Sequence, residues 1–371
     1  MSNPIRVLQV LAGMNRGGAE TLVMNIYRNL DRTKVQFDFI LFRQEECDYN
    51  EEIRKLGGKI YWIPRYNGKN HFKYKKAWNT FFKKNPEYRI IHGHVRSTAS
   101  IYLKIANKYG LTTIAHSHST ASRGKLHEQL LKNIIQYPIR NISDYLFSCS
   151  EQAGLWLYGS KATKKDNFRI IMNAIDTEAY RYNEASRNET RKQLQVENKF
   201  VIGHIGTFTR PKNHTFLLDV FKEVHQRNSD ATLLLIGDGE LRSSIERKIK
   251  NLGLADSVIL TGVRTDVKAL LRAMDVFVFP SLFEGLPVTI IEAQASGLYC
   301  IVSDTITDEV KISDSIKFIS LSETPEYWSN EIQNSDLDRN REDQYKVVME
   351  NGYDIHEVVS WLKEFYLNNW N

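Results

Sequence analysis

The chain of 371 residues is too long for one ordinary hydrophobic core, and its length suits two domains. Its three cysteines, Cys47, Cys149 and Cys300, lie far apart without metal-ligand spacing, so neither a disulfide framework nor a zinc site is predicted. No apolar run is long enough to span a bilayer, and the stretch after Arg6 is too short and too polar for a signal peptide. We therefore expect a cytoplasmic protein that does not cross a membrane.

The net charge of +6 is unevenly distributed along the chain. Residues 1–185 carry 29 Lys and Arg against 16 Asp and Glu, which is a net charge of +13. The remaining residues carry 21 Lys and Arg against 28 acids, which is a net charge of −7. A basic surface is therefore expected in the first domain.

The most basic segment is 53–86, which has no acid between Glu52 and Glu87. This segment suits either an amphipathic surface that lies on an anionic bilayer or a solvated basic helix whose aromatic residues pack inward. The first alternative makes the protein peripheral on the inner face of the cell membrane. No nucleic-acid-binding motif is present, so no nucleic acid partner is expected. The cations are Arg54, Lys55, Lys59, Arg65, Lys69, Lys73, Lys75, Lys76, Lys83 and Lys84, and the interleaved aromatic residues are Phe72, Tyr74, Trp78, Phe81 and Phe82.

Short apolar runs alternate with helical patterns along the whole chain, which is typical of parallel α/β sheets. We predict an N-terminal Rossmann-like domain over 1–176, a polar linker over 177–198 and a second Rossmann-like domain over 199–355. An amphipathic helix over 356–371 is expected to pack back on the first domain. The predicted strands are 5–11, 37–42, 59–63, 90–92, 112–115, 145–147, 200–205, 232–236, 257–260, 276–279 and 299–302.

Glycine and polar residues follow the carboxyl ends of these strands, where ligands of open α/β sheets bind. The loop after the first strand lacks the spacing of a dinucleotide fingerprint, but Gly17 and Gly18 permit a close approach of backbone to ligand. Together such loops predict two facing sheet edges with a cleft between them. The others contain His118, Ser148–Ser150, Gly206, Gly237–Gly239, Arg264 and Ser281–Glu284.

His116 and His118 would lie on one face of a continuing strand, which could mimic a pair of metal ligands. No third ligand at a suitable spacing accompanies them, so no metal site is predicted. His92 and His94 are interpreted as structural or acceptor-side residues.

The segment 280–293 places two carboxylates around the start of a helix. Pro287 suits the first helical position, which leaves the N–H groups of Gly285 and Leu286 free to bind an anion. Glu284 lies beside these donors, and Glu292, in an otherwise apolar helix, needs a hydrogen-bonding partner such as a ribose hydroxyl. The bare spacing of the two acids by itself favours a capping residue and a surface Glu on an ordinary helix, because acids recur often by chance.

The whole E-G-L-P-x4-E pattern of 284–292 resembles the signature of the retaining glycosyltransferases of group 1, or family 4, which have a GT-B fold of two facing Rossmann-like domains. The resemblance extends over essentially the full chain. Its other parts are Gly17–Glu20, Asn173–Asp176, Lys212–His214 and Gly237–Glu240.

The resemblance implies the roles of the site residues. Glu284 and His118 would contact the donor sugar, Gly285 and Leu286 would contact sugar and phosphate, and Glu292 would bind the ribose hydroxyls. Gly17, Gly18, Gly206 and Arg264 are further donor-binding candidates. Lys212 falls on the lysine of the family that neutralises the diphosphate.

Two positions depart from the family pattern. Thr207 stands where the family commonly has Arg, and Arg210 is the candidate that supplies the missing guanidinium. Ala174 stands where the family commonly has Gly.

The resemblance therefore implies a retaining glycosyltransferase that moves a sugar from a nucleotide diphosphate donor, expected to be a UDP-sugar, to a hydroxyl of a glycan or lipid-linked glycan in surface polysaccharide biosynthesis. The resemblance also implies that no bound metal or other cofactor is needed. Two alternatives are a nucleotide-sugar epimerase of the same fold and a non-catalytic partner subunit of a glycosyltransferase.

Overall fold

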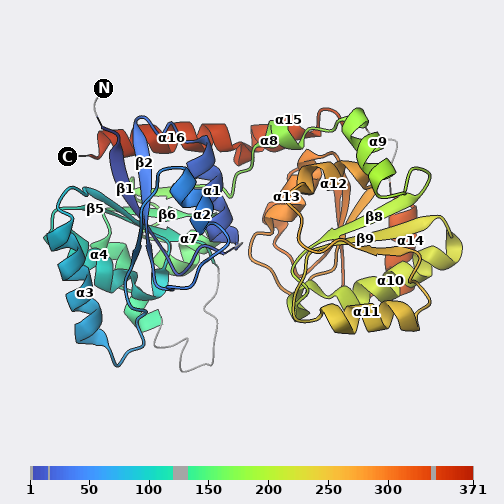
Figure 1. Cartoon of the computed structure of the whole chain (residues 1–371), viewed down its shortest axis with the longest axis horizontal. Coiled ribbons are helices and arrows are strands. Elements are labelled where there is room, and N and C mark those ends of the chain that lie inside the picture. Colours follow the sequence, from blue (N-terminus) through green and yellow to red (C-terminus); the bar gives the residue numbers. More distant parts are fainter. Residues whose placement is uncertain (1–2, 16, 120–132, 336–339, 371) are drawn as a thin grey trace. The chain divides into compact units, whose positions relative to one another are not determined.

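The structure, a computed structural model, describes residues 3–15, 17–119, 133–335 and 340–370. The chain divides into two compact units, each with its own sheet and core (Figure 1). Unit 1 comprises Met1–Ile175 and Ile355–Asn371, and unit 2 comprises Asp176–Asp354.

Unit 1 contains a parallel sheet of seven strands in the order β3-β2-β1-β4-β5-β6-β7. The chain order reverses between β1 and β4, and a crevice at the carboxyl ends of the strands is expected at this point of a doubly wound sheet. The strands are β1 (Ile5–Leu11), β2 (Val35–Leu41), β3 (Ile60–Trp62), β4 (Ile90–Gly93), β5 (Thr112–Ser117), β6 (Tyr145–Ser148) and β7 (Phe168–Ile170).

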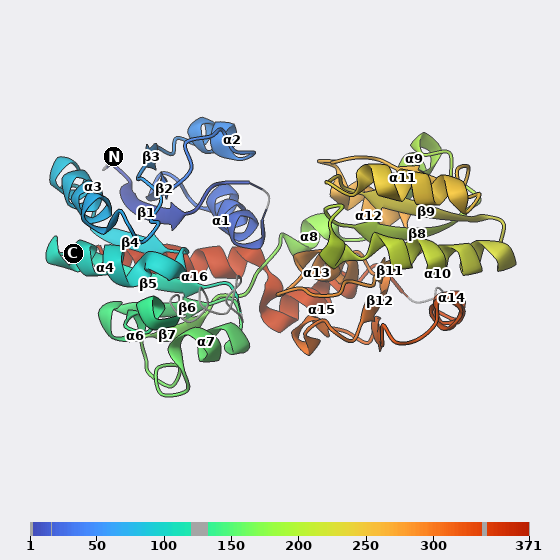
Figure 2. The ribbon, with the colours of Figure 1, turned by 90° about the horizontal axis from the view of Figure 1, so that it is seen from below.

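Helices cover both faces of this sheet (Figures 1 and 2). On one face α1 (Gly18–Asn29) and α16 (Ile355–Asn368) share a core with β1 and β2, and on the other α3, α4 and α7 bury a second core. The remaining helices of the unit join these elements. They are α2 (Asn50–Lys55), α3 (His71–Lys84), η1 (Arg96–Thr98), α4 (Ala99–Lys108), α6 (Ile139–Ile142) and α7 (Glu151–Tyr158).

Unit 2 contains a parallel sheet of six strands in the order β10-β9-β8-β11-β12-β13, with its reversal between β8 and β11. Its core packs α10, α11 and α14 against one face. The strands are β8 (Phe200–Ile205), β9 (Ala231–Ile236), β10 (Val258–Leu260), β11 (Val276–Phe279), β12 (Tyr299–Ser303) and β13 (Ile316–Ile319). The helices are α8 (Thr177–Tyr180), α9 (Glu184–Gln193), η2 (Arg210–Lys212), α10 (His214–Arg227), α11 (Arg242–Asn251), α12 (Val267–Ala273), α13 (Val288–Ala295), η3 (Asp308–Val310), α14 (Pro325–Gln333), α15 (Gln344–Val348) and η4 (Met349–Tyr353).

The segment 177–198 differs from the predicted linker, because it folds as α8 and α9 and belongs to unit 2. Arg187 and Arg191 of α9 both pair with Asp275, which stands immediately before β11. The same carboxylate accepts a 2.7 Å hydrogen bond from the amide of Val201 in β8. The buried side of this helix is therefore ionic instead of apolar, which is why its sequence has the composition of a linker.

Candidate functional site

The loops that follow β8 and β11 meet beside the reversal of the second sheet. The amide of Leu282 donates a 2.8 Å hydrogen bond to the carbonyl oxygen of Pro211. The Asn213 side chain donates a 3.1 Å bond to the carbonyl oxygen of Pro280, from a backbone with a φ of 55°. These two bonds hold η2 against the loop 280–286, so that side chains from both loops can act on one ligand.

Lys212 and Glu284 form an ion pair across these two loops, with 2.8 Å between Nζ and Oε1. The ammonium also lies 4.5 Å from the ring centroid of Phe279, a distance that suits a cation–π contact. Both charged side chains are more than four-fifths buried, which strengthens their interaction relative to an exposed pair. The structure thus brings together the two predicted residues of the donor site that carry opposite charges.

Glycines allow the backbone to pack closely beneath this pair. Gly237 has a φ of 137°, and a Cβ there would lie 2.1 Å from the carbonyl oxygen of Gly206. A Cβ on Gly206 would lie 3.0 Å from the Lys212 side chain. Gly206 therefore leaves the space through which the lysine stem reaches Glu284.

The helix of the signature begins one residue later than predicted. It starts at Val288, and Pro287 is its N-cap with a φ of −77°. Within the described part of the chain, the amides of Gly285 and Leu286 have no hydrogen-bond acceptor. A Cβ built on Gly285 would meet no atom within 4 Å, so this backbone is open to a ligand. The two amides are available as anion donors, as the sequence predicts.

Glu292 is bound by a residue that the sequence analysis assigned to the linker. The hydroxyl of Tyr180 in α8 donates a 2.6 Å hydrogen bond to Oε1 of Glu292. Burial raises the pKa of Glu292 to about 7, although the bond from Tyr180 and the charge of Lys268 both lower it. The Lys268 ammonium lies 5.3 Å from the centre of the Tyr180 ring. Tyr180 and Lys268 therefore belong to this site, although no motif or spacing in the sequence indicated it.

The two arginines among the predicted site residues are placed differently from Lys212. Arg210 is exposed, and its guanidinium makes no ion pair or hydrogen bond within the described residues. Arg264 forms a bidentate pair with Asp266, with distances of 2.6 and 2.8 Å. The structure therefore brings neither guanidinium into contact with the pair of Lys212 and Glu284.

Two buried histidines lie beside this loop: His204, which the sequence analysis did not name, and His214, which ends the Lys212–His214 segment of the resemblance. Nδ1 of His204 in β8 is 2.9 Å from the carbonyl oxygen of Val278, and His214 meets the His204 ring edge-on at a centroid distance of 4.8 Å. Burial lowers the pKa of both imidazoles, that of His214 to about 4. Both imidazoles are therefore neutral and buried beside the loop.

In unit 1 the first glycine loop leads directly into α1. Gly17 is the N-cap of this helix, and Gly18 is its first residue. A Cβ on Gly18 would meet no atom within 4 Å, so the loop offers exposed backbone at the carboxyl end of β1. Arg16 lies outside the described residues.

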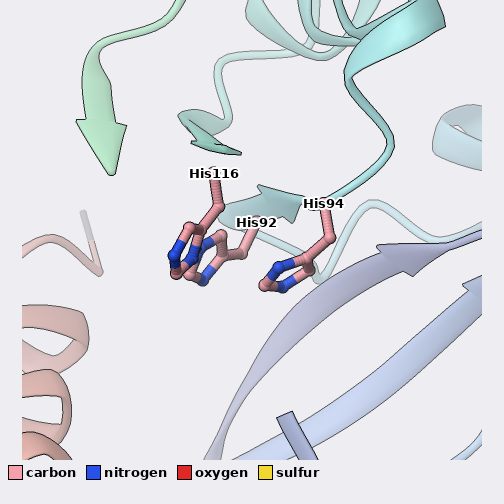
Figure 3. Close-up of side chains that lie close together, drawn as sticks. All are labelled: His92, His94 and His116. Carbon is pink, nitrogen blue, oxygen red and sulfur yellow. The ribbon is translucent and has the colours of Figure 1, made fainter. Parts of the chain in front are cut away.

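The carboxyl ends of β4 and β5 carry four neighbouring histidines, which we call the histidine array: His92, His94, His116 and His118 (Figure 3 draws the first three). One ring nitrogen from each of His92, His94 and His116 lies within 4.8 Å of the others. The sequence analysis found no third ligand to accompany His116 and His118. In the structure, further imidazoles are supplied by His92 and His94, at the end of the adjacent strand β4. Burial lowers the pKa of all four imidazoles, to about 3 for His92 and His118, so the array is neutral.

The aromatic residues of the basic segment pack inward, as the second alternative from the sequence predicts, so Trp78, Phe81 and Phe82 are not available to insert into a bilayer. These three residues of α3 are buried in the second core of unit 1. Phe72 is 85% exposed and is the one aromatic residue of that helix that faces solvent. The lysines Lys73, Lys75, Lys76, Lys83 and Lys84 are all exposed.

Among the described residues, no helix has both the length and the apolar character needed to cross a bilayer.

Comparison with known proteins identifies the family. The profile described as Glycosyltransferase Family 4 matches residues 16–179, and that described as Glycosyl transferases group 1 matches residues 199–332. EpsF of Bacillus subtilis (strain 168), named as a glycosyltransferase, is 34% identical over 98% of this chain and 97% of its own length. The chain therefore belongs to the group 1 and family 4 glycosyltransferases.

Two further proteins are similar over nearly the whole chain. The Escherichia coli UDP-Gal:alpha-D-GlcNAc-diphosphoundecaprenol alpha-1,3-galactosyltransferase is 24% identical over 94% of this chain and 96% of its own. The solved structure of Anabaena Alr3699/HepE in complex with UDP superposes with a TM-score of 0.79 at 16% identity, over 98% of this chain and 100% of its own. This likeness confirms the predicted GT-B fold.

Proposed function

We propose that the protein is a retaining glycosyltransferase that transfers a hexose from a UDP-sugar to a hydroxyl of a glycan or lipid-linked glycan during surface polysaccharide synthesis. The names of relatives support both substrates, since that of the Escherichia coli enzyme contains a UDP-sugar donor and a lipid diphosphate acceptor. HepE was solved with UDP bound. The alternatives from the sequence, an epimerase and a non-catalytic subunit, make different predictions below.

The observation that carries this proposal is the ion pair of Lys212 and Glu284 beside free backbone amides. Departure of the nucleoside diphosphate concentrates negative charge on its phosphate oxygens. The Lys212 ammonium and the amides of Gly285 and Leu286 would oppose that charge most strongly in the transition state. Because Phe279 and Glu284 already hold the lysine in place, little reorganisation is needed when the charge develops.

Glu292 and Glu284 would make the remaining contacts of unit 2 with the donor. Glu292 would accept hydrogen bonds from ribose hydroxyls, and ligand donors would then add to the single bond that Tyr180 provides. Glu284 would contact the donor sugar. On unit 1, His118, Gly17 and Gly18 are the residues that we assign to the donor.

Retention of the anomeric configuration is assigned to a front-face displacement, because no enzymic nucleophile is proposed for a double displacement. The Glu284 carboxylate is paired with an ammonium, which makes it a poor nucleophile for a covalent intermediate. A front-face displacement instead lets the leaving phosphate accept the proton of the acceptor hydroxyl. No metal ion is required if Lys212 and the helix-start amides neutralise the diphosphate, and activity after exhaustive treatment with EDTA would support this.

The experiment is a screen of nucleotide sugars for thermal stabilisation and for slow donor hydrolysis. A stabilising UDP-sugar should be hydrolysed by the wild type and not by Lys212→Ala. Lys199→Ala is the matched control, because Lys199 pairs with Asp230 at 2.9 Å at the opposite, amino-terminal edge of the same sheet. Recovery of an epimerised UDP-sugar would favour the epimerase, and binding without turnover would favour the non-catalytic subunit. Proton NMR of the transferred sugar tests retention.

A further inference from the structure

The histidine array of unit 1 has an internal order that the proposed function does not use. Its four rings form two side-by-side pairs. Nε2 of His92 is 3.1 Å from Nδ1 of His116, with an angle of 11° between the rings. Nδ1 of His94 is 2.8 Å from Nε2 of His118, with an angle of 30°.

The two pairs are stacked on each other. The ring centroids of His92 and His94 are 4.4 Å apart, and those of His116 and His118 are 4.1 Å apart. Each short nitrogen–nitrogen distance requires one nitrogen to donate and the other to accept, because all four imidazoles are neutral. The array therefore consists of two parallel hydrogen-bonded chains.

One residue, Gln9 of β1, bonds to the chain of His94 and His118. Its side-chain oxygen Oε1 is 2.9 Å from Nε2 of His94. The other chain ends at the hydroxyl of Tyr366 in α16, a phenol that is buried and whose pKa is raised by that burial. The Tyr366 hydroxyl is 2.8 Å from Nδ1 of His92.

The first chain has a direction that Gln9 fixes. A carbonyl oxygen only accepts, so Nε2 of His94 must carry a proton. A neutral imidazole has one N–H, which leaves Nδ1 of His94 as an acceptor. His118 therefore donates from Nε2, and its Nδ1 keeps a lone pair.

The second chain runs in the opposite sense. The Tyr366 hydroxyl is buried, and Nδ1 of His92 is its one hydrogen-bond partner within the described residues, so its proton goes to that nitrogen. His92 then donates from Nε2 to Nδ1 of His116. The proton of His116 consequently resides on Nε2.

We propose that Gln9 and Tyr366 are positioning residues that set opposite directions in the two chains, so that His116 presents an N–H group and His118 a lone pair side by side at the end of β5. Both terminal atoms, Nε2 of His116 and Nδ1 of His118, are buried and have no hydrogen-bond partner within the described residues. A buried donor and acceptor of this kind are expected to be satisfied by a ligand.

The pair selects a class of ligand group. A hydroxyl or amide both donates and accepts, so it satisfies both histidines, whereas a phosphate or carboxylate accepts only and would face the lone pair of His118. The ligand is therefore a neutral polar group of a sugar. This last step rests on the proposed function, whereas the directions of the two chains do not.

A metal ion is the competing occupant, since three imidazole nitrogens gather within 4.8 Å. Coordination at the centre of the array would remove both bridging protons and break both nitrogen–nitrogen hydrogen bonds. Zn²⁺ is therefore used as a probe in the experiment.

The experiment is nitrogen NMR on protein labelled with ¹⁵N-histidine, with the four signals assigned by single His→Gln variants. We expect all four residues to be protonated at Nε2 and bare at Nδ1. Protonation at Nδ1 of His94 or His118, or a shift of all four signals with one equivalent of Zn²⁺, would overturn the proposal.

Two variants test the two positioning residues directly. Tyr366→Phe should introduce a second tautomer at His92 and His116 only, and Gln9→Met should introduce one at His94 and His118 only. Gln36→Met is the control, because Gln36 is buried on the neighbouring strand but bonds to the carbonyl oxygen of Leu56. An array that keeps one tautomer in Gln9→Met would show that Gln9 has no positioning role.

The ligand class is tested with the nucleotide sugar that stabilises the protein most. It should shift the His116 and His118 signals, whereas UDP alone and inorganic phosphate should not. If the nucleotide sugar stabilises the protein without moving these signals, the ligand assignment fails. If no nucleotide sugar stabilises it, the proposed function fails, and the tautomers still decide the chain directions.

Discussion

The hydroxyl of Tyr180 lies 2.6 Å from Oε1 of Glu292 and so joins α8 to the helix of the glycosyltransferase signature. The bond leaves the second carboxylate oxygen of Glu292 for a ligand and gives a buried acid one fixed donor. The bond also helps to hold α8, which follows residue 176, within unit 2.

Replacing Glu292 with Ala should weaken binding of UDP, because a carboxylate that accepts two ribose hydroxyls is lost. Hydrogen bonds to a charged group suggest a loss of about 1.5–3 kcal/mol, measured by isothermal titration calorimetry. Tyr180→Phe should cost less, because the carboxylate remains. An unchanged affinity of Glu292→Ala for UDP would remove Glu292 from the site.

The affinity for UDP should also fall as the pH is lowered through 7. The pKa of Glu292 is raised to about 7, so the carboxylate gains a proton below that pH and accepts fewer bonds from ribose. For stability the sign is opposite: the raised pKa favours the folded state at low pH, and this contribution is lost between the ordinary value of 4.5 and about 7.

Glu292→Gln separates this effect from the titration of the phosphate of UDP. Both proteins bind the same nucleotide, so the difference in their pH profiles reports Glu292 alone. The wild-type profile should fall more steeply between pH 7 and 5. Parallel profiles would show that Glu292 does not titrate in this range.

Lys212→Ala should reduce turnover more than donor binding, because the charge that Lys212 opposes grows as the diphosphate leaves. Arg210→Ala should have the smaller effect on turnover, since Arg210 is exposed and has no partner within the described residues. Steady-state kinetics with a saturating UDP-sugar would measure both. Wild-type turnover in Lys212→Ala together with loss of activity in Arg210→Ala would reverse the assignment of the two cations.

Much of the fold could be predicted from the sequence, because strands buried on both faces appear as apolar runs. The two strands that escaped prediction, β7 and β13, are the last strands at one end of their sheets. Phe168–Ile170 includes an exposed arginine, and Ile316–Ile319 includes a half-buried lysine, so neither is a continuous apolar run.

The site could be predicted only where its residues lie close together in the sequence. Glu284, Gly285 and Glu292 belong to one contiguous signature, whereas Tyr180 reaches Glu292 across more than a hundred positions. The histidine array escaped for a similar reason, because only strand pairing brings His92 and His94 beside His116 and His118.

The aromatic residues of α3 should contribute to stability and not to membrane binding. Trp78 is fully buried, so Trp78→Ala should lower the free energy of unfolding by about 3–5 kcal/mol. Phe72→Ala should change it by less than about 0.5 kcal/mol, because Phe72 is 85% exposed. Urea unfolding followed by circular dichroism measures both. A small loss in Trp78→Ala would contradict the packing of this helix.

Binding of α3 to an anionic membrane surface is the remaining prediction for the basic segment, because a lipid-linked acceptor would lie at such a surface. Five exposed lysines should each contribute on the order of 1 kcal/mol near anionic lipid, and binding should weaken as salt rises. A variant that lacks these lysines should no longer bind vesicles of phosphatidylglycerol, as measured by co-sedimentation. In this variant Gln replaces Lys73, Lys75, Lys76, Lys83 and Lys84.

Phe72 decides whether that binding is purely electrostatic. Because it is the one exposed aromatic residue of α3, Phe72→Ser should reduce binding at high salt while the lysines still hold the protein at low salt. Lys73, Lys75 and Lys76 changed to Gln and Lys161, Lys164 and Lys165 changed to Gln each remove three exposed charges from the same unit, and the second variant is the control outside α3. If the control and the α3 variant sediment equally with the vesicles at low salt, the lysines of α3 are only a solvated surface.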